Sequence, residues 1–255
     1  MTITRLTGVT APAAMPALEQ VTQQRVSVVI PALNEARNLE HVFGALPAGL
    51  HEVIVVDGHS TDGTPEIARQ LLPSARVITQ TRKGKGNALA CGFAAVTGDI
   101  IVMIDADGST HPAEIPAFVA ALTQGADFAK GSRFAPGGGS SDITQLRRLG
   151  NRVLGMVVNA IFGTSYSDLC YGYNAFWAKH LPVFGLTPDS PGQRPVWGDG
   201  FEIETLLNLR AATAGLTIAE VPSFEHDRIH GTSNLNTFRD GQRVLRTIVT
   251  ERWRG

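Results

Sequence analysis

Two aspartates separated by one residue, Asp105 and Asp107, follow directly after the apolar segment 99–104. Carboxylates in this spacing at the end of a strand can converge on one hard cation at the carboxyl edge of a parallel sheet, where open α/β sheets bind ligands. Mg²⁺ or Mn²⁺ would bind these oxygens together with diphosphate oxygens of a substrate, and would stabilise a departing diphosphate. The alternative is a solvated turn containing Gly108 and Ser109. The preceding apolar strand favours the metal site.

Three further polar residues lie where other strands are expected to end. Asp57 follows the segment 52–56 and could accept hydrogen bonds from a base or a ribose, or could order a turn with Gly58. Glu35 is either a ribose ligand or a first-turn acid favoured by the helix dipole. Lys85, in the glycine-rich sequence RKGKGNAL, either faces a phosphate at a helix N-terminus or belongs to a solvated basic loop.

Alternating strands and helices must position these residues. Near-continuous apolar strands are expected at 26–30, 52–56, 76–79 and 99–104, with helical patterns between them. Such strands are typical of a parallel sheet that is covered on both faces. In the helix after the second strand, Thr64 is the expected N-cap and Pro65 suits the first helical position. The sequence therefore predicts an α/β fold with a doubly wound, mostly parallel sheet and flanking helices.

The second half of the chain has a different pattern. A strand is expected at 128–134, followed by a mobile loop at 137–141, a long helix at 143–162, a tyrosine-rich segment and a proline-rich loop at 187–195. A helix at 201–214, a strand at 217–224 and a closing helix at 237–253 follow. With no internal repeat and no clear linker, we expect a nucleotide-binding half fused to an acceptor-binding half in one domain.

Composition excludes several classes of protein. In 255 residues, 43% apolar and 18% charged residues exclude a disordered chain. A net charge of −1 disfavours a general nucleic-acid binder. Cys91 and Cys170 cannot form a disulfide framework, which indicates a reducing, cytoplasmic compartment. No apolar run reaches the roughly 18 residues that a membrane-spanning helix needs, and residues 1–24 lack a secretory signal pattern and are expected to be a flexible leader.

Six motifs occur in one order along residues 25–236: VSVVIPALNEARNL, EVIVVDGHSTDGT, RKGKGNAL, GDIIVMIDADGSTHP, KGSRF and EVPSFEHDRIHGTSNLN. Together they resemble family 2 glycosyltransferases of the GT-A fold, and among these the polyprenyl-phosphate (dolichol-phosphate) mannose and glucose synthases. The resemblance implies a GT-A domain over residues 25–236. It also implies an inverting transfer of mannose or glucose from a GDP- or UDP-sugar to polyprenyl phosphate, assisted by Mg²⁺ or Mn²⁺.

The resemblance also implies roles for individual residues. The nucleotide-sugar would bind through Pro31, Ala32, Glu35, Asp57, Lys85, Asp105 and Asp107. The metal would bind Asp105 and Asp107, with Ser109 at a position where the branch often has Gln. The acceptor phosphate would face Arg133, Arg147 or Arg148, and Arg228, with Ser233 nearby.

Two departures from the family pattern concern the donor and acceptor sites. Asp57 is followed by Gly58 where the family has a second Asp, and Asn234 replaces the Lys that usually follows Ser233. The alternative function is therefore transfer to a hydroxyl of a glycan, a lipid or a secondary metabolite. A hydroxyl needs a general base, for which the resemblance offers Asp199 or Glu202.

Other function classes fit less well. A sugar-phosphate nucleotidyltransferase would need a glycine-rich signature with a Lys near the N-terminus, which the sequence does not show. A non-enzymatic nucleotide-binding module would not need Asp105 and Asp107 together with the set of arginines.

The C-terminal segment 237–255 is expected to form an amphipathic helix. Its apolar residues Phe238, Leu245, Ile248, Val249 and Trp253 recur on roughly one side, among several arginines. Such a helix could lie on an anionic bilayer, on the inner face of the membrane, or could pack on its own domain. The sequence leaves these alternatives open.

Overall fold

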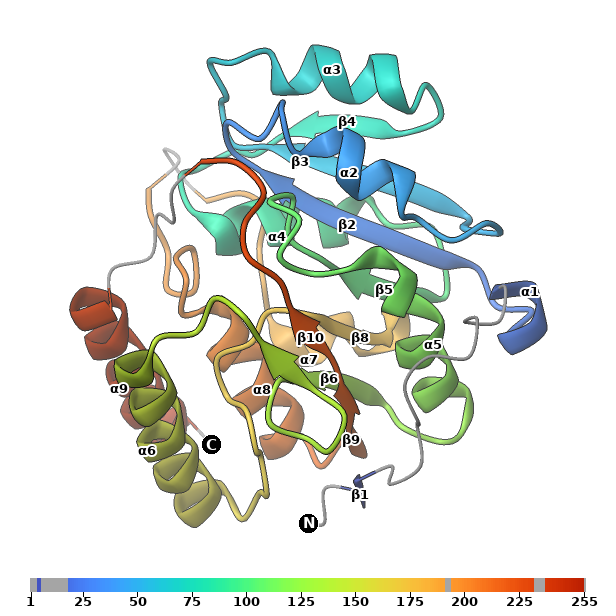
Figure 1. The fold of residues 1–255 in the computed structure, drawn as a ribbon. Helices are drawn as coiled ribbons and strands as arrows, with labels where there is room; N and C mark the ends of the chain where they lie inside the picture. The colour runs from blue at the N-terminus through green and yellow to red at the C-terminus, as the bar shows by residue number, and fades with distance from the viewer. Residues whose placement is uncertain (1–3, 6–17, 191–193, 232–236, 255) are drawn as a thin grey trace.

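Short apolar strands form one sheet through the middle of the molecule. The computed structural model describes residues 4–5, 18–190, 194–231 and 237–254. In this part of the chain the sheet has eight strands in the order β1-β9-β6-β8-β5-β2-β3-β4, and only β8 runs antiparallel to its neighbours (Figure 1). The strands are β1 (Thr4–Arg5), β2 (Val26–Ala32), β3 (Glu52–Asp57), β4 (Arg76–Thr79), β5 (Ile100–Met103), β6 (Phe128–Ser132), β8 (Asn174–Trp177) and β9 (Ile218–Pro222).

Helices cover both faces of this sheet. One face packs against α1 (Leu18–Val21), α2 (Leu39–Gly44), α3 (Thr64–Leu71) and α5 (Ile115–Thr123). The other core contains residues of α4 (Lys85–Ala95), α6 (Gln145–Phe162), α7 (Leu181–Phe184), α8 (Ile203–Thr213) and α9 (Thr237–Arg254). Short 3₁₀ turns occupy Pro112–Glu114 and Ala178–His180. The arrangement is the doubly wound, mostly parallel α/β sheet with flanking helices that the sequence predicts.

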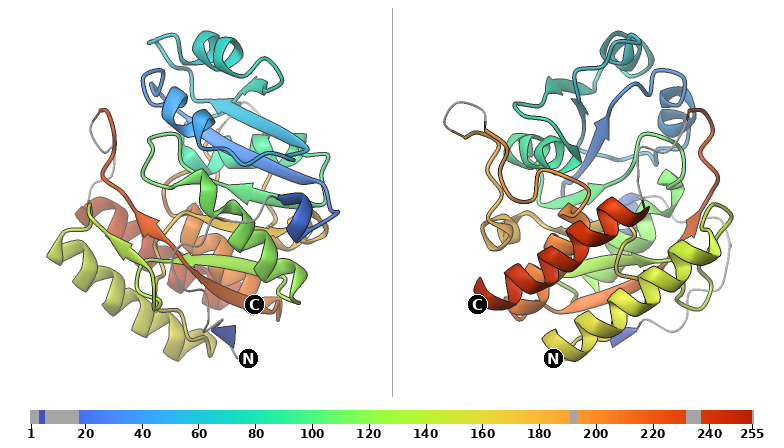
Figure 2. Two further views of the ribbon diagram at one scale, coloured as in Figure 1. Left: turned by 45° about the vertical axis from the view of Figure 1, so that its right-hand side comes forward. Right: turned by 90° about the vertical axis from the view of Figure 1, so that its left-hand side faces the viewer.

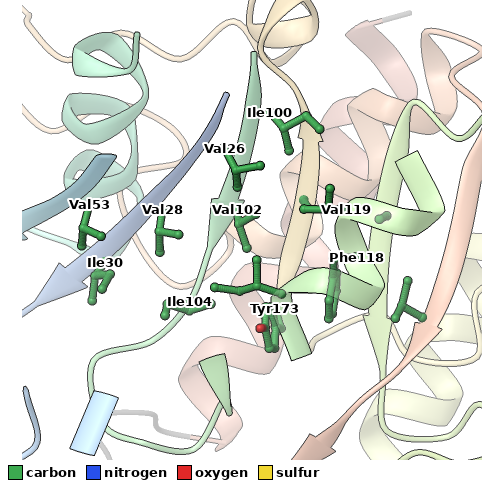
Figure 3. Close-up of a cluster of buried hydrophobic side chains, with 14 of the residues drawn as sticks. Val26, Val28, Ile30, Val53, Ile100, Val102, Ile104, Phe118, Val119 and Tyr173 are labelled. Carbon is green, nitrogen blue, oxygen red and sulfur yellow. The ribbon is translucent and has the colours of Figure 1, made fainter. Parts of the chain in front are cut away.

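Alternation along the strands explains why both faces are buried. Val26, Val28 and Ile30 of β2 belong to the core that contains Phe118, whereas Val29 belongs to the opposite core. Figure 3 shows the first set lying beside the β5 and α5 side chains. Successive side chains of a strand point to opposite faces, so a strand buried on both sides must be apolar throughout. Full burial of each such side chain contributes roughly 1.5–3 kcal/mol.

Two local features differ from what the sequence patterns indicate. The tyrosine-rich segment supplies β8, an antiparallel strand between β5 and β6 that the sequence patterns do not reveal. Thr64 is not the N-cap of α3, because Gly63, at φ 84°, holds that position. Thr64 is instead the first helical residue, and its hydroxyl donates to the Asp62 carboxylate.

Part of the expected mobile loop is also ordered. Gly139–Ser140 forms β7, which pairs in parallel with β10 (Phe224–Glu225) in a separate two-stranded sheet. The pairing brings the segment after β6 against the segment after β9, as the crossing ribbons in Figure 1 show. Glu225 of β10 lines the cavity described below.

The termini lie against the domain where the structure describes them. The predicted flexible leader does not hold for Thr4–Arg5, which pairs with β9, or for Leu18, which is 1% exposed and packs near α5. The expected C-terminal helix is present as α9, and its Val244 and Ile248 are buried in the core. Across the described residues, none of the helices is both long and apolar enough to cross a membrane.

Candidate active site

A cavity of about 490 Å³ opens where β2, β3 and β5 end, at the carboxyl edge of the sheet. Most of the residues predicted from the sequence line it: Pro31, Ala32, Glu35, Lys85, Asp105, Asp107, Ser109, Arg133, Arg147 and Arg228. Four others are absent from its lining, namely Asp57, Arg148, Asp199 and Glu202. Ser233 and its neighbour Asn234 lie outside the described residues.

The two aspartates after β5 lie in a tight loop that lines the cavity. The backbone N–H of Ser109 donates to the Asp107 carboxylate at 2.9 Å, and Gly108 between them has φ 81°. The Thr110 hydroxyl accepts from the backbone N–H of Asp105. Such a loop fixes the direction of both carboxylates before any ligand arrives.

Asp105 forms an ion pair with Lys85, which also binds Glu204. The Lys85 Nζ lies 2.5 Å from Asp105 and 2.6 Å from Glu204. Burial opposes the charge of the lysine, but the two carboxylates outweigh burial and raise its pKa. Burial raises the pKa of Glu204, and Lys85 opposes that shift. These ion pairs join the loop that contains Asp105 to α8.

Glu204 is the acid of the segment 197–204 that lines the cavity, and nothing in the sequence distinguishes it from Asp199 and Glu202. Asp199 accepts a bidentate ion pair from Arg82 at 2.8 and 2.9 Å and lies outside the lining. Glu202 is 7% exposed and its Oε1 accepts from the backbone N–H of Gly200. The structure therefore brings neither Asp199 nor Glu202, the two predicted bases, into the cavity lining. The direction in which the Glu204 side chain points depends on where α8 begins, at Ile203, and the sequence does not specify this boundary.

The glycine-rich loop before α4 packs against protein backbone. The N–H groups of Gly86 and Asn87 donate to the Asp199 carbonyl at 2.8 and 3.4 Å. A Cβ at Gly86 would lie 1.7 Å from the Gly198 carbonyl oxygen. These amides are thus not available to cradle a phosphate. Lys85 is not solvated, because its Nζ pairs with Asp105 and Glu204, and it lines the cavity, so its predicted contact with a phosphate stays a prediction.

Arg228 links the last motif to the aspartate loop. Its guanidinium lies 2.6 Å from the Asp107 carboxylate and 3.0 Å from Glu35. The same segment is tied down by backbone bonds from His226 to Ser109 and from Ile229 to Asp107. Burial raises the pKa of Glu35, which the Asn38 amide and Arg228 partly offset. Glu35, Asp107 and Arg228 therefore form one cluster on the cavity wall.

Arg133 is held by carboxylates of the protein itself. It donates to Asp168 at 2.7 and 3.0 Å and to both oxygens of Glu225 at 3.0 Å. Its side chain is 4% exposed, and its guanidinium lies 4.9 Å from the centre of the Tyr171 ring. These contacts favour a structural role in the wall over a guanidinium that is open to an acceptor.

The arginines of α6 lie at the rim of the cavity. Arg147 lines it and pairs with Asp142 at 3.0 Å, with both side chains partly exposed. Arg148 is exposed and lies 5.5 Å from the centre of the Phe134 ring. Of the two predicted alternatives, the structure places Arg147 in the cavity.

Asp57 orders the turn that follows β3. Its carboxylate accepts from the N–H groups of His59 and Ser60 at 3.0 and 3.2 Å, and the residue is 5% exposed. Its neighbour Gly58 lines the cavity. The turn interpretation is therefore correct, and any contact of Asp57 with a base would be made from this fixed position.

The loop that contains Asp105 and Asp107 could supply part of the coordination shell of a hard divalent cation. Asp105 and Asp107 offer carboxylate oxygens, the ligands that Mg²⁺ and Mn²⁺ prefer. Among the described residues, no cluster of three or more His, Cys, Asp or Glu side chains could hold a metal ion by itself. The remaining ligands would therefore come from a bound diphosphate and from water.

Comparison with known proteins identifies the family. Residues 27–181 match the model of glycosyl transferase family 2. Over 219 residues the chain is 43% identical to an uncharacterized glycosyltransferase of Mycobacterium tuberculosis, covering 83% of this chain and 89% of that protein. It is 31% identical over 243 residues to an undecaprenyl-phosphate mannosyltransferase of Micrococcus luteus, covering 91% and 97%.

A solved structure shows the same fold. Glucosyl-3-phosphoglycerate synthase from Mycobacterium tuberculosis, in complex with Mn²⁺, UDP and glucosyl-3-phosphoglycerate, superposes with a TM-score of 0.73 at 26% identity. The match covers 98% of this chain and 87% of the synthase. With its cavity at the carboxyl edge of a GT-A sheet, the protein is a nucleotide-sugar-dependent glycosyltransferase. The chain belongs to glycosyl transferase family 2 and resembles its polyprenyl-phosphate branch.

Proposed function

We propose that this enzyme transfers mannose or glucose, with inversion, from a GDP- or UDP-sugar to the phosphate of a polyprenyl phosphate. The observation that carries the proposal is the meeting of Asp105 and Asp107 with Arg147 and Arg228 around one cavity. Paired carboxylates suit a cation-bound diphosphate, and arginines suit a second phosphate. The Micrococcus luteus relative, whose name specifies undecaprenyl phosphate, supports this acceptor.

In this proposal the donor lies across the first half of the sheet. Pro31, Ala32 and Glu35 would contact the nucleoside, together with the Asp57 turn. Asp105 and Asp107 would hold Mg²⁺ or Mn²⁺, with Ser109 beside them. When bound, the cation supplies positive charge that stabilises the leaving diphosphate. The complex of the structural neighbour with Mn²⁺ and UDP supports a divalent cation.

The reaction is a direct displacement. An acceptor phosphate oxygen attacks the anomeric carbon while the bond from this carbon to the donor diphosphate breaks, and a nucleoside diphosphate leaves. The acceptor is already ionised, so it needs no general base. Arg147 and Arg228 would reduce the repulsion between the two phosphorylated groups by donating to the acceptor. Arg228 is paired with Asp107 and Glu35. If the nucleotide-sugar and its cation bind Asp107, an N–H group of Arg228 would be released from Asp107 and could donate to the acceptor phosphate.

One observation favours transfer to a hydroxyl as a second candidate. Glu204 lines the cavity beside Lys85, and burial raises its pKa. A carboxylate at this position could accept the proton of an acceptor hydroxyl. The structural neighbour, a glucosyl-3-phosphoglycerate synthase, supports a small phosphorylated acceptor in a related cavity. In this version Glu204 would accept the hydroxyl proton after Lys85 moves toward the donor.

We also propose the division of the chain and its location. Residues 25–236 would form the catalytic GT-A domain, and 237–255 would form a C-terminal helix that touches the inner face of the membrane. The enzyme would work in the cytoplasm, where nucleotide sugars are available as donors.

A radiolabel assay separates the two acceptors. Labelled GDP-mannose, GDP-glucose, UDP-mannose and UDP-glucose are each mixed with enzyme, Mn²⁺ and either undecaprenyl phosphate or 3-phosphoglycerate. The proposal predicts label in the organic phase with undecaprenyl phosphate, and at least about tenfold less after Arg147→Gln, or 1.4 kcal/mol. The control Arg69→Gln removes an exposed arginine of α3 and should have no effect. Label found only on 3-phosphoglycerate would support the second candidate.

A further inference from the structure

Two neighbouring helices carry most of the large apolar side chains that are exposed in the described part of the chain. On α6 these are Leu146, Leu149, Val153, Met156 and Ile161, and on α9 they are Leu245, Val249 and Trp253. Four of the α6 residues recur at three- or four-residue spacing, so they form one stripe along the helix. An exposed apolar stripe of this length marks an interaction surface.

The stripe of α6 lies opposite the side of the helix that packs on the protein. Asn151, Gly155 and Val158 are its buried residues, whereas Leu149 and Met156 are 58% and 57% exposed. On α9 the buried side contains Val244 and Ile248. The sequence pattern grouped Ile248 with the apolar face that could meet a membrane, but this residue packs inward at 1% exposure.

Both helices form the outer layer on the same side of the molecule. They contact each other, and each also contacts α8, which lies beneath them. Figure 2, right, shows α6 and α9 in front of the sheet when this side faces the viewer. Their outward stripes therefore form one surface, which we call the α6–α9 face and define by the eight residues named above.

Charge on the two helices identifies the partner of this face. The α6 sequence contains three arginines and no acidic residue, and α9 contains five arginines and two acidic residues. The acids of α9, Asp240 and Glu251, are buried, whereas Arg148, Arg152, Arg246 and Arg252 are exposed. The whole chain has a net charge of −1, so positive charge is concentrated here. Apolar residues flanked by arginines match the headgroup region of an anionic bilayer.

The position of α6 connects this surface to the cavity. Arg147, two residues into the helix, lines the cavity, and Leu146 and Leu149 begin the exposed stripe next to it. We propose that the α6–α9 face, led by α6, binds the surface of an anionic bilayer and places the cavity rim at the headgroups. This inference rests on the proposed polyprenyl phosphate acceptor, whose phosphate lies at that depth.

Vesicle binding tests the inference without any turnover. Wild type and the double variant Leu149→Asn/Met156→Asn are mixed with vesicles of phosphatidylglycerol and phosphatidylcholine, or of phosphatidylcholine alone, and separated by flotation. We expect wild type to float with the anionic vesicles and the double variant to bind at least about tenfold more weakly. Leu71→Asn, which alters an apolar residue of α3 that is 41% exposed, is the matched control and should bind as wild type does.

Two further measurements complete the test. Thermal unfolding should give the same midpoint for the variants and wild type, since all the altered side chains are exposed. Transfer to a short-chain polyprenyl phosphate in detergent should be unchanged in the double variant, because the cavity is intact. Equal flotation of wild type and the double variant would overturn the inference. A wild-type dimer that the double variant converts to a monomer, without vesicle binding, would also overturn it and would assign the face to a second copy.

The outcomes separate this inference from the proposed function. If wild type binds anionic vesicles through the face but transfers no sugar to any polyprenyl phosphate, the proposed acceptor is wrong and the surface stands. If it transfers sugar in detergent and ignores vesicles, the surface is wrong and the acceptor stands.

Discussion

Replacing Arg133 with alanine should destabilise the fold before it affects any chemistry. The guanidinium is 4% exposed and joins two carboxylates, Asp168 at 0% and Glu225 at 10% side-chain exposure. The alanine variant would leave both carboxylates buried without their cation. Burial alone raises the pKa of Asp168, and Arg133 outweighs burial and lowers it, so the pair depends on the arginine.

The size of the effect follows from the burial of the pair. Removing one partner of a buried ion pair typically costs about 3–5 kcal/mol. For a chain of this size, each kcal/mol shifts the thermal midpoint by about 2–4 °C, so we expect a fall of roughly 6–20 °C. Circular dichroism during heating measures the midpoint. The matched control is Arg25→Ala, which breaks the exposed pair with Asp99 and should leave the midpoint nearly unchanged.

A specific result would refute this reasoning. If Arg133→Ala unfolds within about 1 kcal/mol of wild type and transfers sugar at least about tenfold more slowly with unchanged donor KM, the arginine contacts the acceptor. The sequence-based role would then be correct, and the two carboxylates would be stable without their partner.

Three other substitutions test local features. Burial raises the pKa of Glu52, but hydrogen bonds outweigh burial and lower this pKa from 4.5 to about 2. The ionised carboxylate therefore stabilises the fold fully at pH values above 4.5. Glu52→Gln should therefore lower the midpoint most at neutral pH, and the difference should shrink as pH falls from 4.5 toward 2; a pH-independent difference would count against this. Gly86→Ala should cost about 1–3 kcal/mol by collision with facing backbone, whereas Gly44→Ala, with open space around it, should not destabilise. Lys85→Met should cost about 3–5 kcal/mol, and adding Glu204→Gln should restore part of this by removing an unpaired carboxylate; additive losses would contradict the pairing.

The fold could be predicted because its strands are chemically distinct. Strands such as β2 and β3 are apolar at nearly every position, and this pattern alone indicates a covered parallel sheet. The antiparallel β8 was missed because Asn174 and the preceding tyrosines give no such run. Its position depends on pairing with β5 and β6, which local sequence does not specify.

The sequence predicts only those site residues that directly follow the end of a strand. Asp105 and Asp107 lie at the cavity because a strand ends just before them. The partners of Arg133 lie 35 and 92 residues away, so its pairing with Asp168 and Glu225 follows from the tertiary fold. Likewise, the choice of Glu204 over its neighbours depends on where α8 begins and on the approach of Lys85.

The central claim is that the aspartate loop assists sugar transfer to polyprenyl phosphate. The most direct measurement compares wild type with Asp107→Asn for label transferred from GDP-mannose or UDP-glucose to undecaprenyl phosphate in the presence of Mn²⁺. The account predicts that wild type labels the organic phase, and that the variant is at least about 100-fold slower because a charge-stabilising group is lost. A variant that keeps more than about a tenth of the wild-type rate would contradict the account.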